Sequence, residues 1–457
     1  MTIKENIQNI YNRLSSSLSQ FKRNICAKSF SEIPTCISKI VIGENKIASY
    51  IDKSIQMVNR TDLSNVVTID NYAFQNCTSL VDVTIPESVV SIGSNAFQNC
   101  TSLVNVSIPE STVISGYHTF NGCRNLVNVS MLNIEDELNN TFKDCSNLIN
   151  ITIPNGVTSI GDNAFSNCSS LVDITIPNGV TSIGNGAFSN CSSLADITIP
   201  NGVISIGNGA FDTCISLANI PIPDSVTSIG DYAFSTCINL TSVVVGSGVR
   251  SIGKNAFENC SRITDVIFSN SSNITNISTG AFYNCVKLAN INIPDSVMTI
   301  SAYTFQGCNS LTKVAIPDSV TTIDGGAFAY CGSLTEVTIG DSVTTIGGSA
   351  FAHCESLTEV TIPDSVTTIG SESFRGCESL TSVTFGNRVT SIGNSVFLGC
   401  DNLTDIYFKS TTPPTLSNLQ AIPNTTTIHV PIGSGDAYKS ATNWSLHANK
   451  IVEDIEI

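Results

Sequence analysis

Residues 334–357 read LTEVTIGDSVTTIGGSAFAHCESL, and variants of this stretch recur through most of the chain. The most regular part is Phe-x-x-Cys-x-x-Leu, which occurs fifteen times between Phe74 and Leu403, once with Ile263 in place of leucine. The step from one phenylalanine to the next is 23 residues in twelve of fourteen cases, with one step of 22 and one of 25. A fixed period of this length is the signature of a solenoid, in which one supersecondary unit stacks on copies of itself.

A single repeat predicts two extended segments and a bend. Val337 and Ile339 alternate with polar residues, and this period of two is typical of a short strand. Most repeats continue with Pro-Asp-Ser or Pro-Asn-Gly, which predicts a turn after the strand. Val343 and Ile346 then begin a second extended segment on another wall of the coil. The spacing of Ala-Phe-x-x-Cys predicts one helical turn with its apolar side chains inward.

These units predict an α/β-type repeat solenoid of about fifteen coils of 23 residues, mostly β with short helical turns. Each coil carries about seven apolar side chains that it cannot bury alone, so stacking should build a parallel sheet over a continuous core. We expect three regions: an N-terminal helical segment and cap over 1–61, the solenoid over 62–408, and a C-terminal cap over 409–457.

The N-terminal segment has apolar residues every three or four positions from Ile3 to Ile25, close to a heptad stripe. Two interpretations stay open: a helix docked on the first coil, or an oligomerising or attachment helix that makes a homo-oligomer through residues 3–25. A second helix is expected near 47–58. The first thirty residues show no apolar run of signal-peptide length, and no stretch reaches the length of a membrane span, so we expect no membrane insertion.

Fifteen of the seventeen cysteines occupy one column, three residues after each phenylalanine; the others are Cys26 and Cys36. An evenly spaced file of parallel side chains, odd in number, cannot pair completely as disulfides. We therefore expect a ladder of reduced, buried thiols that pack as small apolar groups.

The charge distribution and the absence of catalytic motifs argue against two classes of function, nucleic-acid binding and catalysis. Residues 1–60 hold nine Lys/Arg and four Asp/Glu, whereas the remainder holds twelve and thirty-three, so an acidic body disfavours nucleic acid. The four histidines lie far apart in sequence, and neither a phosphate-binding glycine motif nor a nucleophile elbow is present. We expect neither an enzyme nor a cofactor.

The outward strand positions are the best candidates for a ligand face. The column two residues after leucine is mostly Asp, Asn or Glu, and the next outward column is mostly Thr or Ser. This is either a solvated sheet surface or a face whose acceptors and hydroxyls suit sugars or basic protein patches. Stacked like charges would need screening or a neutralising partner. The irregular coil at 269–276 is a further local candidate. The candidate ligand-binding residues are Asp173, Asp196, Asp265, Glu336, Glu359, Thr338 and Thr361.

The pattern Leu-x-x-Val-x-Ile-Pro-Asp-Ser-Val-Thr-x-Ile-Gly-x-x-Ala-Phe-x-x-Cys, repeated over roughly 62–408, resembles the BspA-type leucine-rich repeats and the related Treponema pallidum class. The resemblance implies a surface-exposed adhesin or binding protein whose ligand is a protein or glycan on a cell surface. Two alternatives remain open: a bacteriophage tail-associated receptor-binding protein, and an intracellular interaction scaffold. The location is expected to be extracellular or virion-associated, although no signal peptide is visible.

Overall fold

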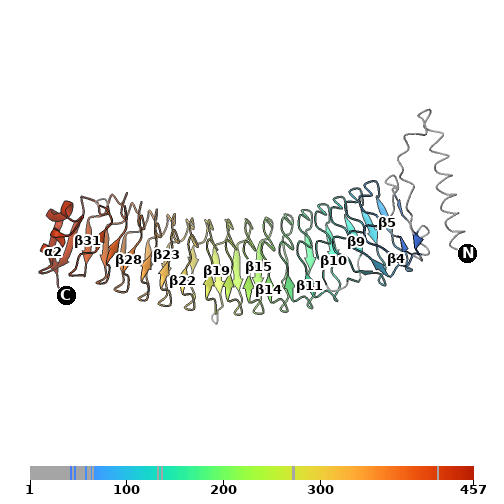
Figure 1. Cartoon of the computed structure of the whole chain (residues 1–457), viewed down its shortest axis with the longest axis horizontal. Coiled ribbons are helices and arrows are strands. Elements are labelled where there is room, and N and C mark those ends of the chain that lie inside the picture. The colour runs from blue at the N-terminus through green and yellow to red at the C-terminus, as the bar shows by residue number, and fades with distance from the viewer. Residues whose placement is uncertain are drawn as a thin grey trace, which may run out of the picture. The chain divides into compact units, whose positions relative to one another are not determined.

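The computed structural model describes residues 63, 66–130, 133–134, 137–269, 273–418 and 421–456, and the backbone alone of 42–43, 46–47 and 57–58. The chain divides into two compact units, Met1–Glu135 and Asp136–Ile457. Both are built of stacked coils in which strands of one coil pair with the equivalent strands of the next (Figure 1).

In unit 2, most coils contribute one strand to a first wall and a strand of two residues to a second wall, and the coil of Asp196 has only an isolated bridge on the first wall. The first-wall strands are β10 (Asn150–Thr152), β12 (Asp173–Thr175), β15 (Asn219–Ile222), β17 (Ser242–Val245), β19 (Asp265–Phe268), β21 (Asn290–Ile291), β23 (Lys313–Ala315), β25 (Glu336–Thr338), β27 (Glu359–Ile362), β29 (Ser382–Phe385), β31 (Asp405–Phe408), β33 (Thr427–Pro431) and β34 (Ile451–Ile455). Within these strands the register is parallel, as in Glu359 opposite Ser382, 23 residues on.

The second wall of unit 2 is one continuous parallel sheet of twelve strands. Its strands are β11 (Ser159–Ile160), β13 (Ser182–Ile183), β14 (Ser205–Ile206), β16 (Ser228–Ile229), β18 (Ser251–Ile252), β20 (Asn276–Ile277), β22 (Thr299–Ile300), β24 (Thr322–Ile323), β26 (Thr345–Ile346), β28 (Thr368–Ile369), β30 (Ser391–Ile392) and β32 (Thr415–Leu416). The predicted parallel β-solenoid is therefore confirmed, and the ladder of strands continues beyond residue 408 through β32 and β33.

Unit 1 repeats the two walls on a smaller scale. One wall holds β3 (Met57–Val58), β5 (Asp82–Thr84), β7 (Asn105–Ser107) and β9 (Asn128–Ser130); the other holds β1 (Ile42–Gly43), β2 (Lys46–Ile47), β4 (Thr68–Ile69), β6 (Ser91–Ile92) and β8 (Val113–Ile114). The prediction of a helix over 47–58 is wrong at both ends, because residue 47 belongs to strand β2 and residues 57–58 form strand β3. Residues 48–56 lie outside the described part of the chain. The stripe from Ile3 to Ile25 also lies outside it.

The third wall, which carries Ala-Phe-x-x-Cys, is not the helical turn predicted from its spacing. Asn163 and Asn167 have positive φ angles of 52° and 63°, which no α-helix accommodates. Backbone donors instead alternate between turns within the coil and bonds to the next coil. The Cys168 N–H donates to the Phe165 carbonyl at 3.0 Å, and the Phe165 N–H donates to the Ala187 carbonyl at 2.7 Å. Asparagine and glycine dominate the two positive-φ columns because they tolerate this region best.

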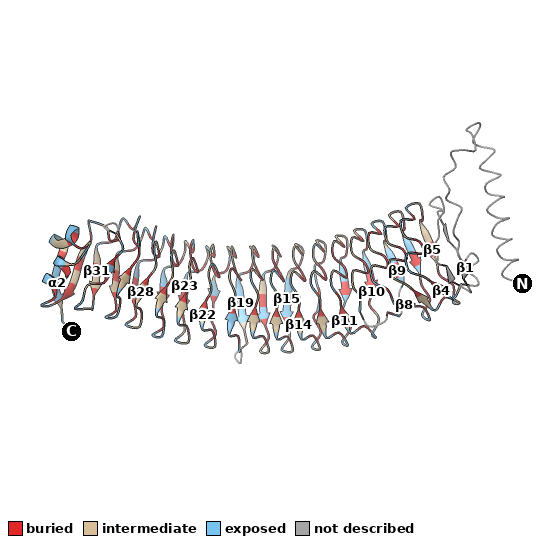
Figure 2. Ribbon diagram, viewed as in Figure 1, coloured by how far each residue is buried: buried red, intermediate tan, exposed pale blue. Residues whose placement is uncertain are grey.

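Apolar ladders fill the space between the walls, and buried residues alternate with exposed ones along the strands (Figure 2). Within unit 2 the phenylalanine rings stack nearly parallel, for example Phe234 on Phe257 with ring centroids 5.2 Å apart. The fifteen column cysteines are buried and free, which confirms the prediction, while Cys26 and Cys36 lie outside the described residues. Most of these thiols have a further role that the sequence did not reveal, as where Cys260 Sγ donates to the Phe234 carbonyl at 3.1 Å.

Beyond β33, helix α2 (Gly435–Ser440), the 3₁₀ helix η2 (Ser445–Lys450) and β34 close unit 2 at its C-terminal end. Trp444 and Tyr438 are fully buried there. The Trp444 ring meets Phe408 edge to face at 5.4 Å, and its Nε1 donates to the Pro414 carbonyl at 2.9 Å. This segment covers the apolar end of the last coil, as a cap on a solenoid must. Among the described residues, no helix has the length and apolar character needed to cross a membrane.

Candidate functional site

The outward face of the first wall in unit 2 carries all seven candidate residues, and every one of them is exposed. In β25 the burial pattern is exposed, buried, exposed, because Val337 enters the core and turns Glu336 and Thr338 to solvent. The same alternation in β27 exposes Glu359 and Thr361. The strand periodicity therefore located this face correctly.

The candidates form a stripe with three groups and do not converge on one pocket. The backbone of Asp173 forms a parallel β-bridge with that of Asp196 in the neighbouring coil. Asp265 lies three coils further along, at about 14 Å for a spacing of about 4.8 Å per coil. Glu336 and Glu359 occupy adjacent coils another three coils on. A ligand that touched all three groups would have to extend along at least about 29 Å, and the whole stripe from Asp173 to Glu359 is about 40 Å long.

Electrostatics along the stripe are uneven. The sequence predicted that Glu336 beside Glu359 would need neutralising, and Lys313 supplies part of this, with its Nζ 2.6 Å from Glu336 Oε2. Both side chains are more than half exposed, so the ion pair adds little stability but cancels local charge. Asp265 accepts only a neutral donor among its described contacts, the Thr264 hydroxyl at 2.8 Å. The stripe keeps a net negative character.

A shallow concavity of about 470 Å³ opens beside the carboxyl end of β25, and Thr338 is the only candidate residue on it. The sequence analysis treated its aspartates as turn residues, although Asp-Ser recurs here every 23 residues, at Asp295, Asp318 and Asp341. Asp318 fixes the turn by accepting the Asp341 N–H at 2.8 Å. The concavity is lined by Asp295, Ile316, Pro317, Asp318, Ser319, Thr338, Ile339, Gly340 and Asp341.

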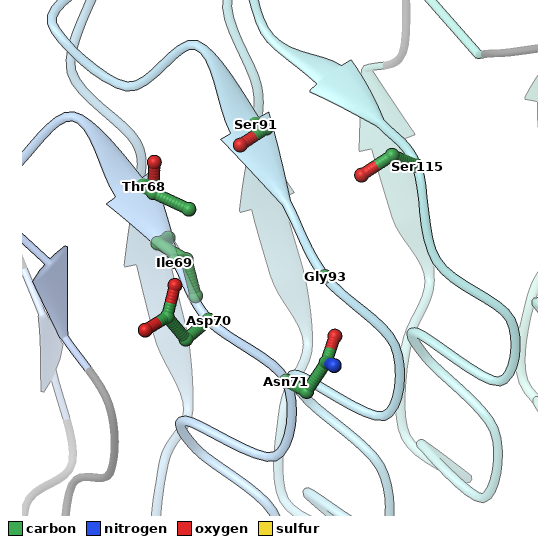
Figure 3. Close-up of a pocket in the computed structure, with 7 residues that line it drawn as sticks. All are labelled: Thr68, Ile69, Asp70, Asn71, Ser91, Gly93 and Ser115. Carbon is green, nitrogen blue, oxygen red and sulfur yellow. The ribbon is translucent and has the colours of Figure 1, made fainter.

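Unit 1 has a separate open depression of about 420 Å³ beside β4 and β6 (Figure 3). Asp70 and Asn71 line it from one coil, and Ser91 and Ser115 from the next two. Asn71 Oδ1 accepts the Ser94 N–H at 2.7 Å, so this side chain is part of the coil-to-coil bonding. In the part of the chain that the structure describes, no three His, Cys, Asp or Glu side chains converge as a metal ion requires.

The column cysteines are poorly suited to nucleophilic chemistry. Burial raises the pKa of the Cys260 and Cys331 thiols to about 12. A thiol attacks as its thiolate, and a raised pKa removes that form at neutral pH. The column is accordingly a structural element of the core.

His429 is a functional candidate that the sequence analysis did not single out among the four histidines. Its Nε2 lies 3.0 Å from Asp405 Oδ1, its Nδ1 lies 2.7 Å from Asp454 Oδ2, and its ring stacks on Tyr407 at 4.4 Å. Partial burial opposes the charged ring, but the hydrogen bonds to the two carboxylates prevail and raise the pKa of His429 above 6.5. The same contact, led by the hydrogen bond from His429, lowers the pKa of Asp405.

We expect replacement of His429 by asparagine to weaken the C-terminal end of unit 2 mainly at mildly acidic pH. Because the folded pKa of His429 is raised, its contribution to stability is complete below pH 6.5 and is lost as the pH rises through the folded pKa. The contribution of Asp405, with a lowered pKa, is complete above pH 3.8 and is lost on acidification below that value. Thermal unfolding followed by Trp444 fluorescence at about pH 5.5 and about pH 9 measures the effect. A variant equally weakened at both pH values would contradict the ion pair.

The described geometry is that of a leucine-rich repeat solenoid with an extended outward face. The family model of the BspA type leucine rich repeat region matches overlapping segments at residues 40–138, 67–195, 135–264, 181–312 and 298–420. This chain therefore belongs to the BspA-type leucine-rich repeat family.

The chain is also similar to solved structures. A leucine-rich repeat protein from Bacteroides ovatus is 31% identical, with 80% of this chain and 87% of that chain covered and a TM-score of 0.64. A leucine rich cell surface protein from Faecalibacterium prausnitzii is 27% identical over 79% of this chain and 90% of that one, with a TM-score of 0.39. The T. pallidum leucine rich repeat protein is 31% identical over 43% of this chain and 83% of its own, with a TM-score of 0.31. No curated protein matches the chain.

Proposed function

We propose that this chain is a non-enzymatic binding or adhesion protein that recognises a protein or glycan on a cell surface or in the extracellular space through the outward face of the first wall. The observation that carries the proposal is the stripe of exposed carboxylates and hydroxyls that the stacked coils present along the first wall. Repeat solenoids commonly use extended surfaces of this kind for binding. Membership of the BspA-type family supports the same class of function.

The charge of the stripe indicates the kind of contact. Asp173, Asp196 and Asp265 present carboxylates in coils that have no lysine or arginine at the corresponding strand positions. Such a face attracts a basic patch on a protein and can accept hydrogen bonds from sugar hydroxyls. Because the side chains are exposed, the attraction should act mainly on the association rate and should weaken with salt.

We expect the triple variant Asp265→Asn, Glu336→Gln and Glu359→Gln to lose about tenfold in affinity at low salt, because the charges that steer the ligand are gone. Binding is measured by capture on an array of immobilised extracellular-matrix proteins and glycans, followed by titration of the strongest ligand.

A matched control removes three carboxylates from other parts of unit 2: Asp162→Asn, Asp231→Asn and Glu378→Gln. Asp162 and Asp231 each accept a backbone N–H of the following coil, and Asn208 makes the same bond at 2.8 Å, so asparagine preserves the structure. The proposal requires the control to bind like the unmodified protein. Equal losses in both variants would show a general charge effect, and no loss in the first would remove the stripe as the binding face.

A further inference from the structure

The third wall of unit 2 carries an aromatic patch, which consists of Tyr303, Tyr330 and His353. These residues belong to three successive coils. Tyr303 and Tyr330 are 49% and 51% exposed, whereas the phenylalanine side chains of the same coils are buried in the core. Neither ring is needed by the phenylalanine ladder, which is complete beneath them through Phe305, Phe328 and Phe351. The patch is therefore not explained by core packing.

Each ring of the patch is supported from one side by the following coil. Tyr330 lies flat against His353, with ring centroids 4.8 Å apart and an interplanar angle of 6°. Tyr303 lies over Gly326, where a Cβ atom would come within 2.6 Å of the Tyr303 ring. His353 lies in the same way over Gly376. Both glycines also have positive φ, so the backbone and the close ring approach favour glycine together.

This support fixes the rings while leaving about half of each tyrosine open to solvent. A preformed aromatic surface loses little side-chain freedom when a ligand stacks on it. The polar side chains Gln306 and Asn309 lie on the same wall, and Asn309 is exposed. They follow Tyr303 in the same coil and offer amide donors and acceptors.

The patch itself carries no charged side chain. Residues 302–309, 325–333 and 347–354 contain no Asp, Glu, Lys or Arg, in a chain whose net charge is −16, although Asp324 and Glu355 directly flank these turns. Farther along the wall, Glu372 and Arg375 pair with each other at 3.0 Å. The rings and amides of the patch offer no charge of their own to pair with a charged ligand, so they favour an uncharged one.

We propose that the aromatic patch binds a neutral saccharide, whose sugar rings stack on Tyr303 and Tyr330. The face of an aromatic ring carries negative partial charge and attracts the positively polarised C–H groups of a sugar face. The sugar hydroxyls then meet the tyrosine hydroxyls and the neighbouring amides. A protein partner is a poorer fit, because two half-exposed rings are far smaller than the roughly 800 Å² per partner of a stable protein interface. This site lies on a different wall from the acidic stripe and stands independently of it.

The test uses the full chain and an array of neutral hexose and N-acetylhexosamine oligosaccharides, with their sulfated and sialylated counterparts. The strongest neutral oligosaccharide is then titrated by calorimetry. We expect the double variant Tyr303→Ala and Tyr330→Ala to lose about tenfold or more in affinity, and the corresponding double phenylalanine variant to stay within about threefold because stacking is kept. The matched control is Tyr72→Ala with Tyr232→Ala, which removes exposed tyrosines from other coils and should change nothing.

Several outcomes overturn the proposal. They are absence of binding to every neutral oligosaccharide, binding confined to charged glycans or to proteins, and equal affinity in the double alanine variant. The triple carboxylate variant of the first wall should bind the neutral oligosaccharide normally. That result separates this site from the acidic stripe, so either one can fail without the other.

Discussion

Replacing Phe257 with alanine is expected to lower the free energy of unfolding of unit 2 by about 3–5 kcal/mol. The side chain is fully buried and stacks on Phe234 at 5.2 Å and on Phe282 at 5.3 Å. The flanking coils cannot collapse into the cavity, because each is hydrogen-bonded through its backbone to the coil of Phe257 on every wall. Since a solenoid is stabilised by contacts between neighbouring coils, one substitution weakens two interfaces at once. Urea unfolding followed by circular dichroism measures the change.

The control for this prediction is Ile267→Ala, in strand β19 on the first wall of the following coil. Ile267 is 53% exposed on the first wall, so its removal should change the free energy of unfolding by no more than about 0.5 kcal/mol. If both substitutions had the same effect, the phenylalanine ladder would not be the main source of coupling between coils.

Replacing Trp444 with alanine should cost a similar amount, about 3–5 kcal/mol, at the C-terminal end of unit 2. The indole is fully buried, packs against Tyr438 at 5.0 Å and Phe408 at 5.4 Å, and satisfies the Pro414 carbonyl. Its loss also uncovers the apolar end of the last coil, which favours association of two chains at that end. Sedimentation velocity measures the association, and urea unfolding measures the stability.

Trp444→Phe is the informative comparison, because it keeps much of the packing and loses the hydrogen bond to Pro414. Its cost should be closer to about 1–3 kcal/mol, the range for a buried acceptor left without its donor. An alanine variant that stays monomeric and is as stable as the unmodified protein would show that the C-terminal segment does not act as a cap.

The sequence contained enough information for the coils and their register, because both depend on periodicity. Glu336-Val337-Thr338 alternates as a strand must, and the 23-residue step aligns it with the next coil. The third wall was misread because the spacing of Ala164, Phe165 and Cys168 fits a helical turn as well as a pair of tight turns. The distinguishing signal was the recurrence of Asn or Gly at two positions four residues apart, as at Asn163 and Asn167.

The position of the candidate face was also predictable from periodicity, because outward strand positions recur every two residues. Some contacts of the side chains, however, involve residues outside the 23-residue repeat. Lys313 belongs to the same column as Glu336, so their pairing follows from register once the coil is known. The contact between His429 and Asp454 joins β33 to β34, a strand that follows no 23-residue pattern. In the aromatic patch, Tyr330 and His353 occupy one column, 23 residues apart, so their stacking follows from the register, whereas Tyr303 belongs to the column four residues earlier.

The uniform register also means that distances along the stripe can change only in whole steps. Removing or adding one 23-residue coil between Asp265 and Glu336 would keep neighbouring coils hydrogen-bonded in register, and it would change the distance between the two carboxylates by about 4.8 Å. Recombination between near-identical repeats could therefore retune the spacing of the acidic groups without any new fold. A ligand that bridges the two carboxylates would therefore fit one number of coils, and adding or removing one coil would mismatch it by about 4.8 Å.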